Sequence, residues 1–383
     1  MRARLTSLGL FLATLNGCEA GVASPIAEQG ADPLQPSVPA MPAPSALPPA
    51  PDVGGTPAVR GPSGAPDAAS PVVMTDAGPP AVDAGVNDAG APMLPTFSQA
   101  IDPLADAGAV TLVQSGFGFL EGPRWLADAG VLLVSDVTRG RIYRYDPKAS
   151  GDPFTVFRDP SGNSNGLTVD ALGRLVACEH VNRRLSWSAG SSAPTTLVDR
   201  YQGHRFNAPN DVVAARDGTI YFSDPDYNLG GAAAELSFNG VYALFPDGGL
   251  AAVVTDLPEP NGVAVSPDDS TLYVSDTSQN QWRSYARLSD GGLRLLGQFS
   301  TTQQGGSGGD GLGVDLAGNV YAATFDGVHV YRPDGGYRGR IQVPDGPTNL
   351  SFGGDDGRTL FVTTGAFGVA SLYRVRLAVP GLP

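Results

Sequence analysis

The chain has 383 residues and a net charge of −14 at pH 7, and it contains no long run of Lys or Arg. Nucleic-acid-binding proteins present basic stripes to the phosphates, so this charge argues against nucleic acid as a partner. A cationic ligand or a metal ion is the more natural partner.

Residues 1–17 have the pattern of a bacterial secretion signal, with a basic start and a short apolar stretch over residues 8–15. The stretch is too short to span a bilayer. Residues 15–18 (LNGC) resemble a lipobox, which predicts cleavage before Cys18 and acylation of that cysteine. With Cys18 acylated, Cys178 has no intrachain partner, so no disulfide is expected. The prediction is an exported lipoprotein, anchored to a membrane and facing the periplasm or the cell surface; the alternative is a plain secreted or periplasmic protein.

Residues 18–105 differ in composition from the rest of the chain. They are mostly Pro, Ala, Gly, Ser and Asp, as in the run TDAGPPAVDAGVNDAGAP. Such a segment has too few large apolar residues to offset the entropy lost on ordering. It is predicted to be a disordered tether, and its Pro-rich parts extend by about 3 Å per residue. The folded domain is predicted over residues 106–383.

The folded domain repeats one motif six times. Residues 203–225 (GHRFNAPNDVVAARDGTIYFSDP) show it: a polar residue opens a short apolar run, a turn follows, and a β-rich run ends at an aspartate. Four-stranded propeller blades repeat about every 40–50 residues. The copies are spaced by 44, 45, 51, 49 and 39 residues, so an all-β, six-bladed β-propeller is predicted. The copies begin at Glu121, Asn165, Asn210, Asn261, Asp310 and Asn349.

Residues 109–114 (AVTLVQ) form an apolar strand that precedes the first copy. In propellers an N-terminal strand commonly completes the last blade from outside, which removes the edge that an open array would expose. We therefore expect residues 109–114 to lie beside residues 371–377 (SLYRVRL).

The six residues that begin the copies are expected to meet around the propeller axis, because the first strand of each blade lies nearest that axis. We call them the ring residues. An alternative is that these Asn-Gly and Asp-Gly pairs are only hairpin turns, for which they are the commonest sequences. Their register favours a site, since each stands just before an inner strand rather than between two strands.

The ring residues include two carboxylates, Glu121 and Asp310, and the neutral amides Asn210 and Asn261. This all-oxygen set suits a hard divalent cation. Ca²⁺ is the first expectation, with Mg²⁺ and Mn²⁺ as alternatives. Zn²⁺ is a weaker alternative, because zinc prefers His or Cys ligands and the three histidines are not in ligand spacing.

Several motifs in one order carry a family resemblance. They are EGP at residues 121–123, ACEH followed by NRR after residue 176, RFNAPND at 205–211, PNG at 260–262 and DG at 310–311. From about residue 117 onward the chain resembles the SMP-30/gluconolactonase/LRE-like family. The resemblance implies a six-bladed propeller with one divalent metal ion at the channel mouth and hydrolysis of sugar lactones such as gluconolactone.

The resemblance also implies roles for individual residues. The implied metal ligands are Glu121, Asn210, Asn261 and Asp310, and the implied substrate contacts are Arg205, Asn207 and Asn165. Which of Asn207 and Asn210 holds which role stays open. In the implied mechanism the metal ion polarises the lactone carbonyl while Asp310 activates water as a base or attacks directly.

Two other functions are compatible with these residues. One is a related propeller hydrolase that acts on phosphotriesters or non-sugar lactones, since the same cation site would polarise a phosphoryl oxygen. The other is a non-catalytic, tethered propeller that binds a partner on one face. Two carboxylates in the axial register favour a hydrolase, because a binding module does not need them.

Overall fold

The computed structural model describes residues 97–301, 308–365 and 369–383. The predicted signal peptide, Cys18 and most of the predicted tether lie outside these residues. The described residues form strands, turns and loops, and none of them is helical. Accordingly, this part of the chain offers no helix that could cross a membrane.

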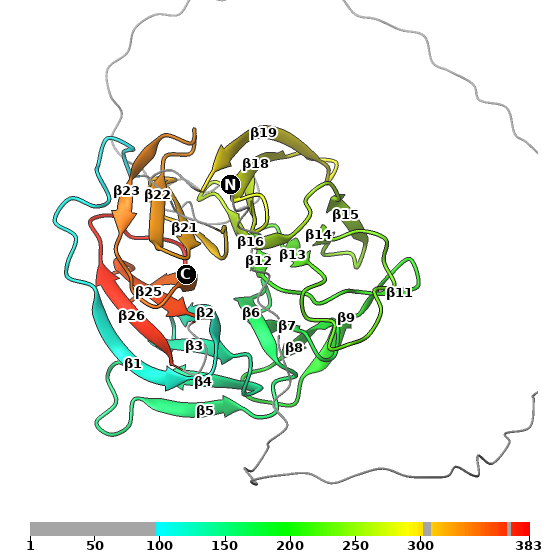
Figure 1. Cartoon of the computed structure of the whole chain (residues 1–383), viewed down its shortest axis with the longest axis horizontal. Helices are drawn as coiled ribbons and strands as arrows, with labels where there is room; N and C mark the ends of the chain where they lie inside the picture. The colour runs from blue at the N-terminus through cyan, green and yellow to red at the C-terminus, as the bar shows by residue number, and fades with distance from the viewer. Residues whose placement is uncertain (1–96, 302–307, 366–368) are drawn as a thin grey trace, which may run out of the picture. The chain divides into compact units, whose positions relative to one another are not determined.

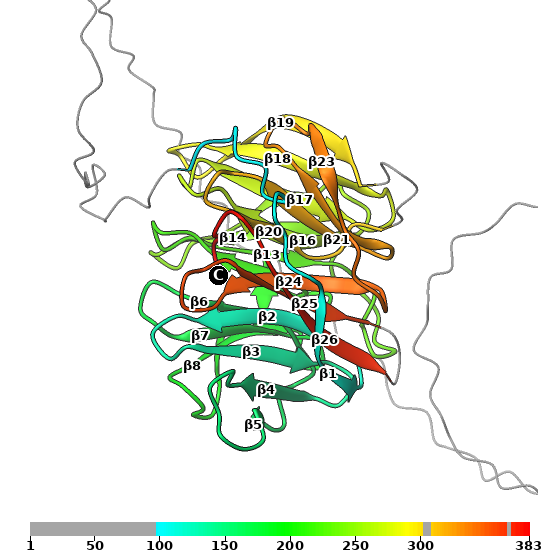
Figure 2. The same ribbon diagram turned by 90° about the vertical axis from the view of Figure 1, so that its left-hand side faces the viewer.

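Six antiparallel four-stranded sheets surround a common centre, which confirms the predicted six-bladed β-propeller (Figure 1). Blades 1 to 5 each use strands that follow one another in sequence, whereas blade 6 combines the last three strands with the first. Figure 2 shows how the strands of blade 1 follow each other outward from β2 to β5.

The strands of blades 1 to 3 are β2 (Leu120–Leu126), β3 (Val131–Asp136), β4 (Arg141–Tyr145), β5 (Phe154–Arg158), β6 (Ser164–Val169), β7 (Leu175–Glu179), β8 (Arg184–Ser188), β9 (Thr195–Val198), β12 (Val212–Ala214), β13 (Ile220–Asp224), β14 (Gly240–Leu244) and β15 (Leu250–Val254). A separate hairpin precedes blade 3 and consists of β10 (Arg200–Tyr201) and β11 (His204–Arg205).

The strands of blades 4 to 6 are β16 (Pro260–Val265), β17 (Thr271–Asp276), β18 (Gln281–Arg287), β19 (Leu293–Ser300), β20 (Leu312–Val314), β21 (Val320–Thr324), β22 (Gly327–Tyr331), β23 (Tyr337–Ile341), β24 (Pro347–Gly353), β25 (Thr359–Thr364), β26 (Ala370–Arg376) and β1 (Thr111–Phe117).

The ring of blades is closed by β1, as predicted. It pairs antiparallel with β26, so that Thr111 lies opposite Arg374 and Phe117 lies opposite Ala370. The pairing gives blade 6 its outer strand. The observed strand begins and ends a few residues later than the predicted segment of residues 109–114.

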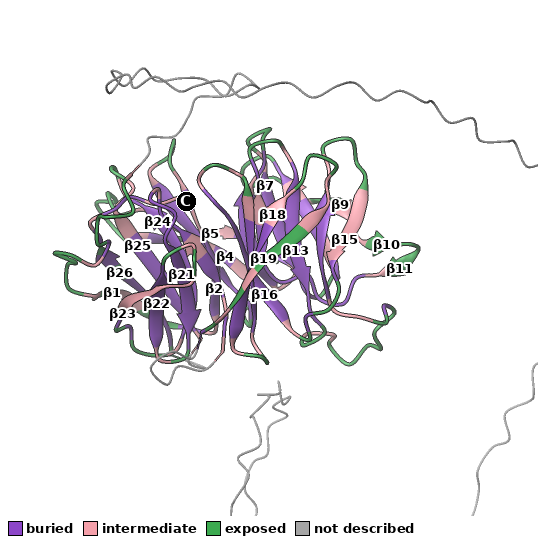
Figure 3. Ribbon diagram, turned by 90° about the horizontal axis from the view of Figure 1, so that it is seen from above, coloured by how far each residue is buried: buried purple, intermediate pink, exposed green. Residues whose placement is uncertain are grey.

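The core lies between the blades. Middle strands such as β3 (VLLVSD) and β21 (VYAAT) are buried along their whole length. Each is covered by a neighbouring blade on both faces, which explains why apolar and small residues dominate its sequence. The outer strand β19 is largely exposed, and Figure 3 shows the same trend from the centre to the rim.

The aspartate that ends the repeated motif anchors the loop that leads into the first strand of its blade. Buried carboxylates at the ends of β3, β13 and β17 accept main-chain N–H groups from this loop. Asp224 Oδ2 accepts from Asn207 N at 2.8 Å, and Asp276 Oδ2 accepts from Glu259 N at 2.8 Å. The aspartate therefore fixes the loop that enters its own blade, and this also fixes the ring residue that follows the loop.

The packed part of the chain begins before Asp106, inside the segment that was predicted to be a disordered tether. Pro103 is buried and its carbonyl accepts a hydrogen bond from Ala378 N at 3.1 Å. Leu104 packs against the core between blades 5 and 6. The boundary at residue 106 is thus a few residues too late, because two isolated apolar residues in a Pro/Ala-rich sequence give no periodic signal.

Candidate active site

The six ring residues lie where the chain enters the first strand of each blade, as the register predicted. Five of them are buried, and Asp310 is partly exposed. Their main chains are tied to the second strand of the same blade, as when Asn210 N bonds Ser223 O at 2.8 Å and Asp310 N bonds Ala323 O at 3.0 Å. The ring is therefore fixed by the blades.

The glycines that follow four ring residues allow the inner strands to converge. A β-carbon at Gly122 would lie 2.0 Å from the carbonyl oxygen of Asn165, and one at Gly262 would lie 2.4 Å from that of Asp310. Only glycine permits so close an approach of two backbones. Since Gly122 and Gly262 lie inside β2 and β16, these pairs are contacts between blades rather than hairpin turns.

Hydrogen bonds link the ring amides in one direction. Asn165 Nδ2 donates to Asn210 Oδ1 at 2.7 Å, and Asn210 Nδ2 donates to Asn261 Oδ1 at 2.6 Å. The Asn261 side chain in turn interacts with the carboxylate of Asp310. On the other side of the ring, the Asn349 side chain interacts with Glu121. These bonds fix the orientation of the amide groups.

Three carboxyl groups share this small buried region. Burial, followed by the charges of Asp310 and Asp211, raises the pKa of Glu121 well above its usual range. Burial and the charge of Asp211 raise the pKa of Asp310 to about 8. Burial raises the pKa of Asp211 to about 6. None of the three forms an ion pair with a basic side chain of the described residues.

The ring residues fit a divalent cation. Buried carboxylates are normally paired with a basic group or a metal ion, and these have no basic partner. Among the described residues Asn165 Oδ1 is buried without a hydrogen-bond partner, and the oxygen of Asn261, which accepts one hydrogen bond, retains a second lone pair. In the described residues no three His, Cys, Asp or Glu side chains form a metal-binding group, so a cation here would depend on amide oxygens as well.

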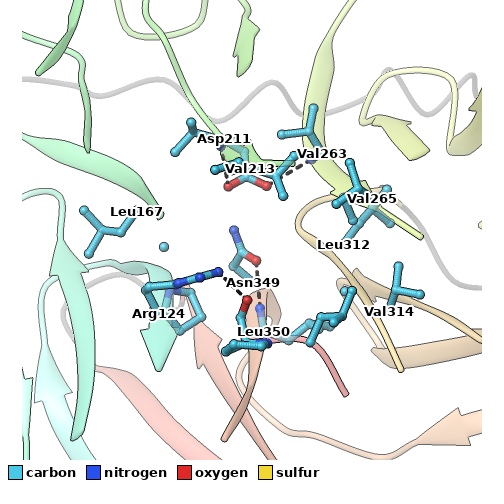
Figure 4. Close-up of a pocket in the computed structure, with 18 of the residues that line it drawn as sticks. Arg124, Leu167, Asp211, Val213, Val263, Val265, Leu312, Val314, Asn349 and Leu350 are labelled. Carbon is cyan, nitrogen blue, oxygen red and sulfur yellow. Dashed lines mark hydrogen bonds between the residues drawn. The ribbon is translucent and has the colours of Figure 1, made fainter. Parts of the chain in front are cut away.

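A cavity of about 270 Å³ continues the channel beyond the ring. Its walls include the ring residue Asn349 and residues that follow ring residues along the inner strands, and Figure 4 shows Asp211, Asn349 and Arg124 pointing into it. None of the four proposed metal ligands lines this cavity. It is therefore the interior of the propeller rather than the space in which a substrate would meet Glu121 and Asp310.

Sequence reasoning gave no role to Asp211, which the structure places at the ring. It stands where four of the other five copies have glycine, and its carboxylate accepts hydrogen bonds from Val212 N and Val263 N, both at 3.0 Å. The signal was a charged residue in one copy at a position that is otherwise small or apolar. His180 was also missed: burial lowers its pKa to about 4, and its side chain lies beside Asn210.

The predicted substrate contacts do not all lie in the ring. Asn165 does, whereas neither Arg205 nor Asn207 hydrogen-bonds a ring residue in the described part of the chain. Arg205 Nη2 donates to Asn182 O at 2.6 Å. Asn207 Nδ2 donates to Asn239 Oδ1 at 3.1 Å, while its own Oδ1 is buried without a partner. The roles of Arg205 and Asn207 in substrate binding stay predictions.

Comparison with known proteins identifies the family. Residues 119–366 match the model of the SMP-30/Gluconolactonase/LRE-like region. The chain is 32% identical over 297 residues to the gluconolactonase of Zymomonas mobilis, covering 70% of this chain and 82% of that protein. It is 43% identical over 254 residues to the 6-deoxy-6-sulfogluconolactonase of Pseudomonas putida, covering 64% of this chain and 82% of that protein. The structure of a gluconolactonase from Xanthomonas campestris has a TM-score of 0.65 at 33% identity, covering 74% of this chain and 93% of that chain. The chain thus belongs to the SMP-30/gluconolactonase/LRE-like family.

Proposed function

We propose that this protein hydrolyses sugar lactones at the ring. The observation that carries the proposal is the pair of carboxylates of Glu121, which is buried, and Asp310, which is partly exposed; they lie among amide oxygens and form no ion pair with a basic side chain of the described residues. The relatives named gluconolactonase and 6-deoxy-6-sulfogluconolactonase support lactone opening as the reaction. The substrate class is therefore cyclic esters of hydroxylated acids.

A divalent cation, with Ca²⁺ as the first choice, would be held by Glu121, Asn210, Asn261 and Asp310. When bound, it would supply positive charge that polarises the lactone carbonyl and stabilises the ionised carboxylates. Hard oxygen ligands favour Ca²⁺, Mg²⁺ or Mn²⁺ over zinc. The ring amides are already oriented by their mutual hydrogen bonds, so little rearrangement is needed for binding.

Asp310 performs the proton transfer in this proposal. Its carboxylate takes a proton from water as the water oxygen bonds to the carbonyl carbon. The bond from that carbon to the ring oxygen then breaks, and Asp310 returns the proton to the leaving oxygen, which gives an open-chain hydroxy acid. Direct attack by Asp310 on the carbonyl is the alternative. In both routes the residue must be ionised at the start.

The main chain around Asp310 keeps its carboxylate in position. Its carbonyl oxygen accepts a hydrogen bond from Ser275 Oγ at 2.6 Å, and Thr277 Oγ1 donates to the adjacent Gly309 carbonyl at 2.8 Å. Both donors come from blade 4, whereas Asp310 enters blade 5. The carboxylate is therefore held by two blades, which restricts its movement during proton transfer.

The proposal is tested by measuring base consumption during opening of D-glucono-1,5-lactone, corrected for spontaneous hydrolysis. Activity should be lost with a chelator and return with Ca²⁺. Asp310→Asn should lower kcat by about 10²- to 10⁴-fold, the usual contribution of a general base. Asp290→Asn is the matched control, because Asp290 is an exposed carboxylate in the turn between β18 and β19, where it accepts a hydrogen bond from Gly292 N at 2.9 Å. An Asp310→Asn variant that opens the lactone at the parental rate would refute the assigned role.

A further inference from the structure

One loop of blade 3 is much longer than its counterparts. β13 ends at Asp224 and β14 begins at Gly240, which leaves 15 residues between them, whereas the corresponding loops of the other five blades have two to five. The loop starts at the ring end of the blade, because Ser223 O accepts the hydrogen bond from the ring residue Asn210. Blade 3 therefore contributes an additional segment, residues 225–239, beside the ring.

This loop is held in place by amide hydrogen bonds. Asn239 Nδ2 donates to Asp226 Oδ1 at 3.0 Å and to Pro258 O at 2.7 Å. Asn239 Oδ1 accepts from Asn207 Nδ2 at 3.1 Å. The neighbour of Asp226 in sequence is Tyr227, so these bonds also fix the position of that tyrosine. Asn207, predicted as a substrate contact, supports the loop that carries Tyr227.

Tyr227 spans from the ring to the solvent. Its hydroxyl lies beside Thr277, and the charges of Asp310 and Glu121 act on it. Burial of the hydroxyl, followed by the charge of Asp310, raises the pKa of Tyr227 well above its usual range, so the phenol stays protonated. Yet 39% of the residue is exposed. The polar end of Tyr227 thus faces the ring while part of its aromatic surface faces solvent.

The hydrogen bonds of Thr277 determine what the tyrosine hydroxyl can do. Thr277 Oγ1 donates its proton to Gly309 O at 2.8 Å and accepts from Asn261 Nδ2 at 3.0 Å. The side chain of Tyr227 also interacts with Thr277, which places the phenol next to the proposed metal ligand Asn261. A phenolic oxygen both donates and accepts, so it can accept a hydrogen bond from a hydroxyl group of a ligand.

We propose that Tyr227 is a substrate-binding residue that selects polyhydroxylated lactones. Its phenolic oxygen accepts a hydrogen bond from a lactone hydroxyl, and its aromatic surface packs against the C–H groups of the lactone ring. The inference rests on the proposed function and deepens it, because it names the feature of the lactone that is recognised. An unsubstituted lactone has no hydroxyl group, so Tyr227 contributes less to its binding affinity.

The test compares D-glucono-1,5-lactone with δ-valerolactone, which has the same ring without hydroxyls. Tyr227→Phe should raise KM for gluconolactone by about 3- to 10-fold, the value of one hydrogen bond, with kcat and the KM for δ-valerolactone unchanged. Tyr227→Ala should raise KM for gluconolactone further. Phe325→Ala is the matched control, because Phe325 is an aromatic residue, 77% exposed, in the corresponding loop of blade 5.

Each outcome distinguishes this inference from the proposed function. If wild type opens gluconolactone but Tyr227→Phe leaves both KM values unchanged, or raises both equally, Tyr227 does not recognise the lactone hydroxyls. The inference then fails while the proposed function stands. If wild type opens neither lactone, the proposed function fails, and calorimetric titration with D-glucitol replaces the kinetic assay. Weaker glucitol binding by Tyr227→Phe then supports the inference, and equal or absent binding in both proteins overturns it.

Discussion

Gly262→Ala should move Asp310 without changing any group that takes part in the chemistry. The new β-carbon would lie 2.4 Å from the carbonyl oxygen of Asp310, whereas ordinary contact begins at 3.4 Å, so the two backbones must separate by 1.0 Å. A misplacement of about 1 Å can lower the rate by about 10²-fold. The contact atoms are main chain, so no flexible side chain can absorb the strain. We therefore expect kcat to fall by about two orders of magnitude.

The same separation should also cost about 1–3 kcal/mol of folding free energy, as overpacking of a core does. For a domain of this size that lowers the Tm by about 2–4 °C per kcal/mol. Lactone opening measured well below the Tm separates the kinetic effect from unfolding. Gly151→Ala is the control, because a β-carbon there meets no atom within 4 Å. A Gly262→Ala variant with kcat within twofold of wild type would show that the position of Asp310 is not set by this contact.

The remaining predictions concern pH, the N-terminus and substrate binding. Without a divalent cation the protein should be less stable at pH 8 than at pH 5. The folded pKa of Asp310, about 8, lies above its unfolded value, so the contribution of Asp310 to the free energy of unfolding is lost as pH rises from about 4 to 8. Saturating Ca²⁺ should raise the Tm at pH 8, and a cation-free Tm that rises from pH 5 to pH 8 would contradict the raised pKa of Asp310. Deleting residues 1–96 should leave the Tm unchanged, whereas deletion through residue 117 should cause aggregation, seen by light scattering, since β26 would become an exposed edge. Arg205→Ala should raise KM with little change in the Ca²⁺ affinity measured by calorimetry, and a loss of Ca²⁺ binding would instead make it structural. Cys18→Ala should prevent lipid incorporation in a bacterial host, and unchanged labelling would exclude acylation at that cysteine.

The number of blades, the position of each blade in the sequence and the closure of the ring by the first strand could be predicted, because each depends on local signals. The repeat spacing identifies the blades, and an unpaired apolar strand before the first copy requires a partner. The ring residues followed from register alone. The spacing of 51 residues between Asn210 and Asn261 was the largest, and the structure shows why: the blade between them carries the loop of residues 225–239.

The partners of side chains in loops could not be predicted in the same way. Nothing in the sequence near Tyr227 indicates that its hydroxyl lies beside Thr277, fifty residues later. Asp211 was likewise visible as a charged residue, but its bond to Val263 N depends on the contact between blades 3 and 4. Such contacts are set by how neighbouring blades approach each other, and periodicity carries no information on them.

The pairing of β1 with β26 has a consequence for how the protein is made. Thr111 Oγ1 donates to Arg374 O, 263 positions later in the chain. During synthesis β1 emerges first, yet its partner emerges last, so a strand with unpaired main-chain groups must persist while five blades form. Unpaired strands of this kind are a hazard for aggregation in nascent chains. The strand's own sequence, TLVQSGF, reduces that hazard, because Gln114, Ser115 and Gly116 interrupt the apolar residues. Closure over so many residues is also a contact of high sequence separation, which slows folding, and it is expected to be the last and slowest step in folding of the propeller.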